Sequence, residues 1–174
     1  AHFSWMIIQN EKNNGACLQL INEDMIQGVY DSGEILLDIK FKNYSNWNIN
    51  DYFKKQTIIA KKLILKFLKI INKKDIKGKK INEDNSFYLP RLNTKINGWI
   101  NWYSWNTKEI LRFIKAFGDP YDGASSMINN KRVFIKNANL VKKSTFHPFQ
   151  NGLICKIDNK KYDVITTNGI INLE

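Results

Sequence analysis

The chain has 174 residues, 43% of them hydrophobic and 25% charged, with a formal net charge of +11 at pH 7. This composition is ordinary for a folded protein with one domain, or one domain and a small appendage. Lysines separate the longest apolar stretches, at residues 58–60 and 63–65, which argues against a membrane span, and nothing resembles a signal peptide. We therefore expect a cytoplasmic protein.

The positive charge has two explanations. A surplus of basic residues is typical of nucleic-acid-binding proteins. Here the surplus is nearly all lysine, in a chain also crowded with asparagine and isoleucine, which is what AT-rich codons produce. Arginine, which pairs better with phosphates and guanines, occurs only at Arg91, Arg112 and Arg132. RNA is therefore the less favoured partner.

The cysteines and histidines do not form a metal-binding pattern. Cys17 and Cys155 are far apart in the sequence, and only His2 and His147 add to them. Because a metal site needs clustered ligands, we expect no metal. We expect both thiols to be small buried side chains in a reducing compartment.

The first part of the chain predicts a short helix, two strands and a long helix. Residues 2–9 suit the short helix, and residues 16–21 and 35–41 suit two strands joined by a long loop, 22–34. Long loops between strands often contain functional residues. An apolar period of 3.6 residues then predicts an amphipathic helix over 53–71. Its expected buried positions are Phe53, Ala60, Leu63, Ile64, Phe67 and Ile71.

The second part predicts one more helix and then strands. After an irregular aromatic segment, 87–94, the pair Asn106 and Glu109 has the spacing of a helix capping box. The helix is expected to end at Phe117, before a Gly-Asp-Pro turn. The tail then predicts a small antiparallel sheet or barrel. Its expected strands are 132–140, 152–157, 162–167 and 170–173.

Local chemistry alone identifies no active site. Gly28 and Gly33 fit neither a dinucleotide-binding nor a P-loop pattern, and no serine or cysteine lies in a recognisable nucleophile motif. Composition and periodicity therefore predict only a soluble mixed domain with an exposed loop around Asp31.

Ordered motifs run through nearly the whole chain. The segment 30–36 (YDSGEIL) matches an Asp-x-Gly-x-Ile signature, and residues 1–21 match the helix and strand that precede it. Residues 100–124 match a linker with a tryptophan, a helix and a Pro-x-x-Gly-Ala turn. In this order the chain resembles the folate-dependent formyltransferases. Residues 88–100 and 146–152 resemble the nucleotide-sugar N-formyltransferases in particular.

The resemblance implies transfer of a formyl group from N10-formyltetrahydrofolate to an amine. In the family an asparagine stabilises the oxyanion, a histidine handles the proton, and an aspartate orients and charges that histidine. Asp31 matches the aspartate; otherwise it is a loop residue in an Asx-turn. The asparagine and histidine belong before Ala1 in the pattern. We therefore expect the later part of a longer protein, inactive by itself.

The resemblance also implies binding roles. Gln27, Gly28, Val29 and Tyr30 are predicted to lie along the folate, with a plain solvent loop as the alternative, although extra residues near 24–27 shift the loop alignment. Gly33 is expected to serve backbone geometry. Lys115 stands where the family usually has an arginine.

Three residues are predicted to bind the substrate: Arg91, Trp99 and Trp102. Arg91 suits a pyrophosphate, and a structural salt bridge is equally open. Trp99, Trp102 and Trp105 suit stacking on a nucleobase, although wedging the linker against the core is favoured.

The expected fold is mixed α/β: the C-terminal part of a Rossmann-like formyltransferase domain (residues 1–72), a helical linker (73–140) and a small antiparallel β domain (141–174). The expected substrate is a nucleotide-linked amino sugar. The alternatives are a methionyl-tRNA formyltransferase and a non-catalytic, basic RNA-binding module. A homodimer is left open.

Overall fold

The computed structural model describes residues 2–72, 76–80, 88–159 and 161–174, which fold into two compact units. The main unit comprises Ala1–Glu11, Ser45–Asn50 and Leu89–Glu174. The hairpin unit comprises Lys12–Tyr44 and Asp51–Tyr88. Both are discontinuous in sequence, and the domain boundaries predicted at residues 72 and 140 stay predictions.

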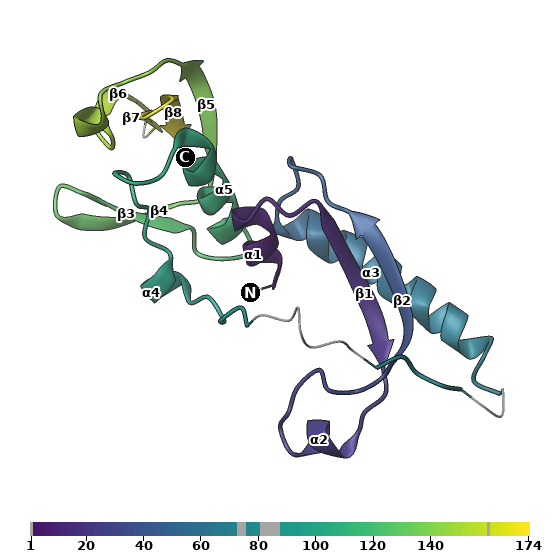
Figure 1. Cartoon of the computed structure of the whole chain (residues 1–174). Helices are drawn as coiled ribbons and strands as arrows, with labels where there is room; N and C mark the ends of the chain where they lie inside the picture. Colours follow the sequence, from purple (N-terminus) through teal and green to yellow (C-terminus); the bar gives the residue numbers. More distant parts are fainter. Residues whose placement is uncertain (1, 73–75, 81–87, 160) are drawn as a thin grey trace. The chain divides into compact units, whose positions relative to one another are not determined.

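The hairpin unit is built on two antiparallel strands, β1 (Asn13–Gln19) and β2 (Ile35–Lys42). Apolar and polar side chains alternate along β2, so Leu37, Ile39 and Phe41 share one face, as predicted. The register slips between Leu18 and Gln19, where Leu36 becomes the unpaired residue of a β-bulge. The bulge lies where the long loop leaves the hairpin (Figure 1).

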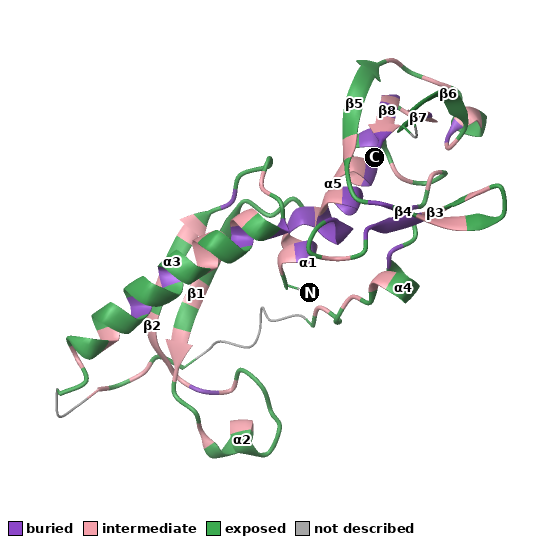
Figure 2. Ribbon diagram, turned by 180° about the vertical axis from the view of Figure 1, so that it is seen from behind, coloured by how far each residue is buried: buried purple, intermediate pink, exposed green. Residues whose placement is uncertain are grey.

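The long helix, α3 (Ile49–Leu68), runs beside the hairpin for most of its length (Figures 1 and 2). The helix was predicted, but its buried face was partly wrong. Tyr52, Ile59 and Leu63 are buried, whereas Phe53 and Ile64 are 47% and 54% exposed. Apolar residues occur on several sides of α3, so the periodicity predicts a helix but does not identify its buried face. The predicted position Ala60 is exposed as well, and so is Ile71 beyond the helix end.

Two helices form the core of the main unit. The first, α1 (His2–Ile8), contacts α5 (Thr107–Phe117) through a bond from Ser4 Oγ to the Ala116 carbonyl, at 2.9 Å. The predicted capping box is present, with Asn106 and Glu109 each accepting from the other's backbone N–H. Ile110, Ile114 and Phe117 are buried along one face of α5 (purple in Figure 2).

Antiparallel strands complete the main unit. β3 (Ala124–Ile128) pairs with β4 (Lys131–Ile135). A second sheet has the order β5-β8-β7-β6. Its strands are β5 (Ala138–Lys143), β6 (Ile154–Asp158), β7 (Lys161–Thr166) and β8 (Gly169–Leu173).

The strand expected at 16–21 is observed as β1, three residues earlier at its start, and the strands of the main unit differ from prediction in two further places. The expected strand 132–140 is divided between β4 and β5, because residues 136 and 137 instead bond to the last carbonyl of the chain, that of Glu174. β3 was not predicted, because the Ala-Ser-Ser residues with which it begins have a low preference for strands. The aromatic segment is irregular up to a one-turn helix, α4 (Thr94–Asn97), while Phe87 lies outside the described residues. The mixed α/β class with antiparallel sheets is confirmed.

Candidate functional site

Asp31 lies in the loop that joins β1 to β2. The loop contains one helical turn, α2 (Glu23–Ile26), in a segment that was predicted to be irregular (Figure 1). Asn22 caps this turn by accepting from Met25 N–H. Asp31 is exposed, and its backbone has a left-handed φ of 61°. Aspartate tolerates this conformation better than most residues, but the conformation still costs about 1 kcal/mol or more unless its surroundings hold it.

Polar side chains hold the loop closed. Gln19 Nε2 donates to the carbonyl of Asp31 at 3.1 Å and to that of Gly33 at 3.0 Å. Asn22 Nδ2 donates to the Ser32 carbonyl at 3.2 Å. The Ser32 hydroxyl lies 3.0 Å from two acceptors, Asn22 Oδ1 and the Val29 carbonyl. The backbone on both sides of Asp31 is therefore fixed by side chains of the same loop.

Gly33 lies against Leu20, where the two ends of the loop come together. We call this point the neck of the loop. A Cβ atom at this position would lie 1.8 Å from the Leu20 carbonyl oxygen, so only glycine fits without moving the backbone. The next ladder bond, from Leu20 N–H to the Glu34 carbonyl, is 2.9 Å long. The prediction that Gly33 serves backbone geometry is confirmed.

The residues predicted to contact folate precede Asp31. Gln27, Gly28 and Val29 donate their backbone N–H groups to carbonyls of α2, and Gly28 has a φ of 97°. All four residues from Gln27 to Tyr30 are exposed, and Tyr30 is 85% exposed. Together with Ile21 and Ile26, which are also exposed, Val29 and Tyr30 give this loop an apolar surface. Such a surface suits contact with a flat ring system.

The Cys17 thiol responds to the charge of Asp31. Partial burial, then the charge of Asp31 and then that of Asp38 raise the pKa of this thiol above its ordinary value. The expectation that both cysteines are buried is wrong. Cys17 lies opposite Asp38 on the hairpin and is exposed, and Cys155 is the unpaired residue of a bulge in β6 and is exposed as well.

The main unit contains an aromatic groove. Four of the five tryptophans line it, among them Trp99 and Trp102, and its volume is about 650 Å³. Trp102 Nε1 donates to Ser126 Oγ at 3.0 Å. Trp99 is 40% exposed, and the Arg132 guanidinium lies 4.4 Å from its ring centroid. The structure thus brings the two predicted tryptophans together.

Arg91 lies in a smaller pocket of the same unit. This pocket, of about 130 Å³, is also lined by Ser4 and Tyr121, and it shares Leu92 with the aromatic groove. Arg91 is exposed, and neither the Lys136–Asp119 nor the Lys161–Glu174 ion pair involves it. Its substrate-binding role and the structural salt bridge both stay predictions.

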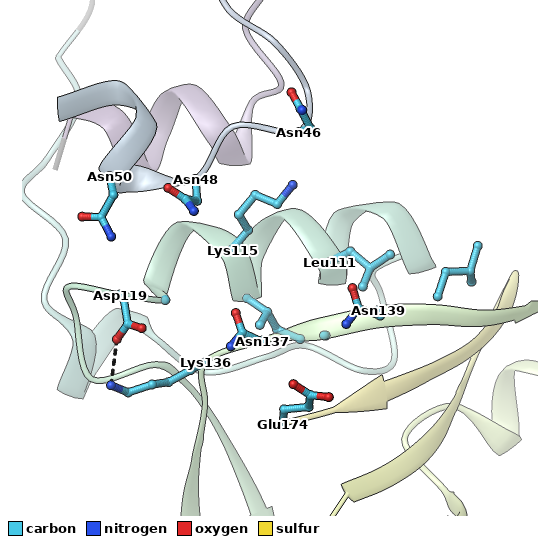
Figure 3. Close-up of a pocket in the computed structure, with 14 residues that line it drawn as sticks. Asn46, Asn48, Asn50, Leu111, Lys115, Asp119, Lys136, Asn137, Asn139 and Glu174 are labelled. Atoms are coloured by element: carbon cyan, nitrogen blue, oxygen red, sulfur yellow. Dashed lines mark hydrogen bonds and ion pairs between the residues drawn. The ribbon is translucent and has the colours of Figure 1, made fainter. Parts of the chain in front are cut away.

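A third pocket of the main unit is polar (Figure 3). It has a volume of about 490 Å³ and lies between α5, the segment before α3 and the start of β5. Lys115 extends from α5 and donates to the Ser45 carbonyl at 3.2 Å. Lys136 forms a 2.8 Å ion pair with Asp119, which raises the pKa of Lys136. Both lysines of the pocket therefore have structural bonds, and the predicted site residues are all elsewhere.

Neither a metal site nor a membrane span is found in the part of the chain that the structure describes. No three side chains of the metal-ligating kinds gather there. No helix within the same residues is long and apolar enough to cross a bilayer.

The fold and the motifs agree with known proteins. The family model of the formyl transferase C-terminal domain matches residues 93–174. The chain is 25% identical over 167 residues to a methionyl-tRNA formyltransferase of Coxiella burnetii (strain CbuK_Q154), a match that covers 96% of this chain. It spans about half the length of that curated relative, 50%. Residues 93–174 thus match the C-terminal domain of formyl transferases, and the two comparisons support the formyltransferase family for this chain.

Solved structures show the same fold. HypX from Aquifex aeolicus, in complex with tetrahydrofolic acid, superposes with a TM-score of 0.73 at 20% identity, over 98% of this chain and 28% of that one. The N-formyltransferase from Helicobacter canadensis, in complex with folinic acid and dTDP-3-aminofucose, gives 0.68 at 19% identity, over 97% and 57%. WlaRD, a sugar 3N-formyl transferase, gives 0.69 at 21% identity, over 100% and 59%.

Proposed function

We propose that the complete protein transfers a formyl group from N10-formyltetrahydrofolate to the amine of a nucleotide-linked amino sugar. The observation that carries this proposal is the Asp31 loop, which presents the family's Asp-x-Gly signature on a hairpin held by Gln19, Asn22 and Ser32. The hairpin and α3 would complete the Rossmann-like catalytic domain. Two sugar N-formyltransferases share the fold over 97% and 100% of this chain.

In this proposal Asp31 orients and charges a histidine from the segment of the protein before this chain. A carboxylate beside an imidazole stabilises its protonated form and raises its pKa. The amine nitrogen attacks the formyl carbon, the bond to N10 breaks, and the proton lost by the amine ends on N10 of the folate. The developing oxyanion needs a donor, which the family supplies with an asparagine.

The binding surfaces suit these two substrates. The exposed apolar side chains of Val29 and Tyr30 would contact the folate rings, while Gln27 and Gly28 form the adjacent backbone. The aromatic groove of Trp99 and Trp102 would receive the nucleotide base, with Arg91 near its pyrophosphate.

The test is a formylation assay of the complete protein with N10-formyltetrahydrofolate and dTDP- or UDP-linked amino sugars, read by mass spectrometry of the sugar. Formylation that is lost in Asp31→Asn supports the proposal. Unchanged formylation in Asp31→Asn excludes the proposed role of Asp31.

Methionyl-tRNA formyltransferase is the second candidate, favoured by the 25% identity to the Coxiella enzyme and by the +11 charge. Formylation of methionyl-tRNA in the same assay, with no reaction of the sugars, would select it. A non-catalytic RNA-binding module is the third. The methionyl-tRNA formyltransferase and the RNA-binding module both require an affinity for RNA that falls steeply with rising salt concentration. An absence of RNA binding at physiological salt would exclude both hypotheses.

A further inference from the structure

The Gln19 side chain occupies an unusual position in the hairpin. It belongs to the last residue of β1, directly beside the bulge at Leu36. Its amide group has two N–H bonds, and Nε2 donates to two carbonyls, those of Asp31 and Gly33. These two carbonyls flank Ser32. The Gln19 side chain alone therefore connects the end of β1 to both Asp31 and Gly33.

We propose that Gln19 is a positioning residue for the formyl transfer, which holds Asp31 in its reactive orientation by binding the backbone carbonyls of Asp31 and Gly33. This inference rests on the proposed function, because it assumes the catalytic role of Asp31. Gln19 itself acts through Asp31 and needs no contact with substrate.

The loop depends on hydrogen bonds such as these because packing holds little of it. Residues 26–31 are all exposed, so packing contributes little to their order. The left-handed backbone at Asp31 is itself unfavourable. Two hydrogen bonds from one amide offset that cost directly at the strained residue. The bulge changes the direction of the strand where Gln19 leaves it.

The geometry also explains why glutamine is suited to this role. Leucine is one bond shorter and has no donor. Glutamate would direct carboxylate oxygens at two carbonyl oxygens and repel both. Histidine carries one ring N–H at about the same reach, so it keeps one of the two bonds. The expected order of loop stability is Gln19, then Gln19→His, then Gln19→Leu, then Gln19→Glu.

The first test does not depend on activity. Backbone hydrogen exchange of residues 31–34 is expected to become about tenfold faster in Gln19→Leu and faster still in Gln19→Glu. Gln9→Leu, which removes an exposed amide at the end of α1, is the matched control and is expected to leave these residues unchanged. If Gln19→Glu disrupts the whole hairpin, hydrogen exchange across β2 rises as well. In that case the exchange of residues 31–34 in Gln19→Leu is the result that tests the role of Gln19.

The second test uses the complete enzyme. In Gln19→Leu the kcat is expected to fall about tenfold while the KM for the amine stays within about twofold, because the reacting groups and not the amine site are displaced. Gln19→His should restore part of the kcat, which a general loss of stability would not explain.

The outcomes separate the two proposals. Unchanged activity in Asp31→Asn overturns the role of Asp31 on which both rest. Lost activity in Asp31→Asn, with unchanged exchange and kcat in Gln19→Leu and Gln19→Glu, overturns the role of Gln19 alone.

Discussion

The guanidinium of Arg132 stacks on the indole of Trp99, with 4.4 Å between Cζ and the ring centroid, and it also lies 4.9 Å from the centroid of Phe134. The same guanidinium donates to the hydroxyl of Ser125, which is fully buried, and to the Thr94 carbonyl. The stack fixes the Trp99 ring and covers part of it. Only the remaining surface of Trp99 is therefore available to a ligand in the aromatic groove.

Replacing Arg132 is expected to destabilise the main unit. Arg132→Met keeps the apolar stem but removes the donors to Ser125 and Thr94, at a cost of about 1–3 kcal/mol. Arg132→Lys should be destabilised less than Arg132→Met, because lysine keeps the positive charge but lacks the planar guanidinium group. The free energy of unfolding of both variants is measured in urea, with tryptophan fluorescence as the signal. Lys131→Met, an exposed neighbour on β4, is the control and should change stability by less than about 0.5 kcal/mol.

Cys17 provides a chemical report on Asp31. Burial contributes most to the raised pKa of its thiol and the charge of Asp31 comes next, so Asp31→Asn should lower that pKa. At pH 8 a larger fraction of the thiol is then ionised, and alkylation becomes faster. The rate is measured against pH in a Cys155→Ser background. Asp38→Asn is expected to act in the same direction but more weakly, and a pKa that stays constant in Asp31→Asn would contradict the placement of the carboxylate.

Gly33→Ala should disturb the neck of the Asp31 loop. The new methyl group would overlap the Leu20 carbonyl oxygen, so the backbone must shift and the bond between Leu20 and Glu34 is weakened. We expect faster amide exchange at residues 20 and 33–35. The comparison is Gly28→Ala, where the methyl group meets only open space and the cost of about 1 kcal/mol comes from its φ of 97°. Equal exchange in the two variants would show that the neck tolerates a side chain.

A buried hydroxyl pair joins α5 to the turn between β7 and β8. Thr107 and Thr166 approach to 2.7 Å, Thr166 donates to the Gly169 carbonyl, and Asn168 N–H donates to Thr107. Thr166→Val removes two of these bonds from a site that excludes water and should cost about 1–3 kcal/mol in urea unfolding. Thr145→Val, at an exposed position, should be nearly neutral.

The helices of the chain could largely be predicted from the sequence. The capping box at Asn106 and the Gly-Asp-Pro stop are local signals, so α5 was placed to within a residue. The face of α3 could not be predicted, since it depends on which of several apolar stripes the hairpin covers. The order of the strands in the second sheet was likewise not available from local patterns.

The candidate site was predictable only where a motif marks it. Asp31, Gly33 and the tryptophans stood out, whereas Gln19, Asn22 and Arg132 did not. Asn22 followed by two acidic residues is a helix-start signal that could have revealed α2. Nothing in the sequence indicates the bulge at Leu36, and without it the direction of the Gln19 side chain cannot be inferred.

The residues that hold the Asp31 loop by their side chains, Gln19, Asn22 and Ser32, bear only amide and hydroxyl groups. None of these groups gains or loses a proton between pH 4 and pH 10. The bonds that these side chains make therefore do not depend on their own protonation. A kinetic pH profile of formyl transfer in that range contains no contribution from titration of Gln19, Asn22 or Ser32.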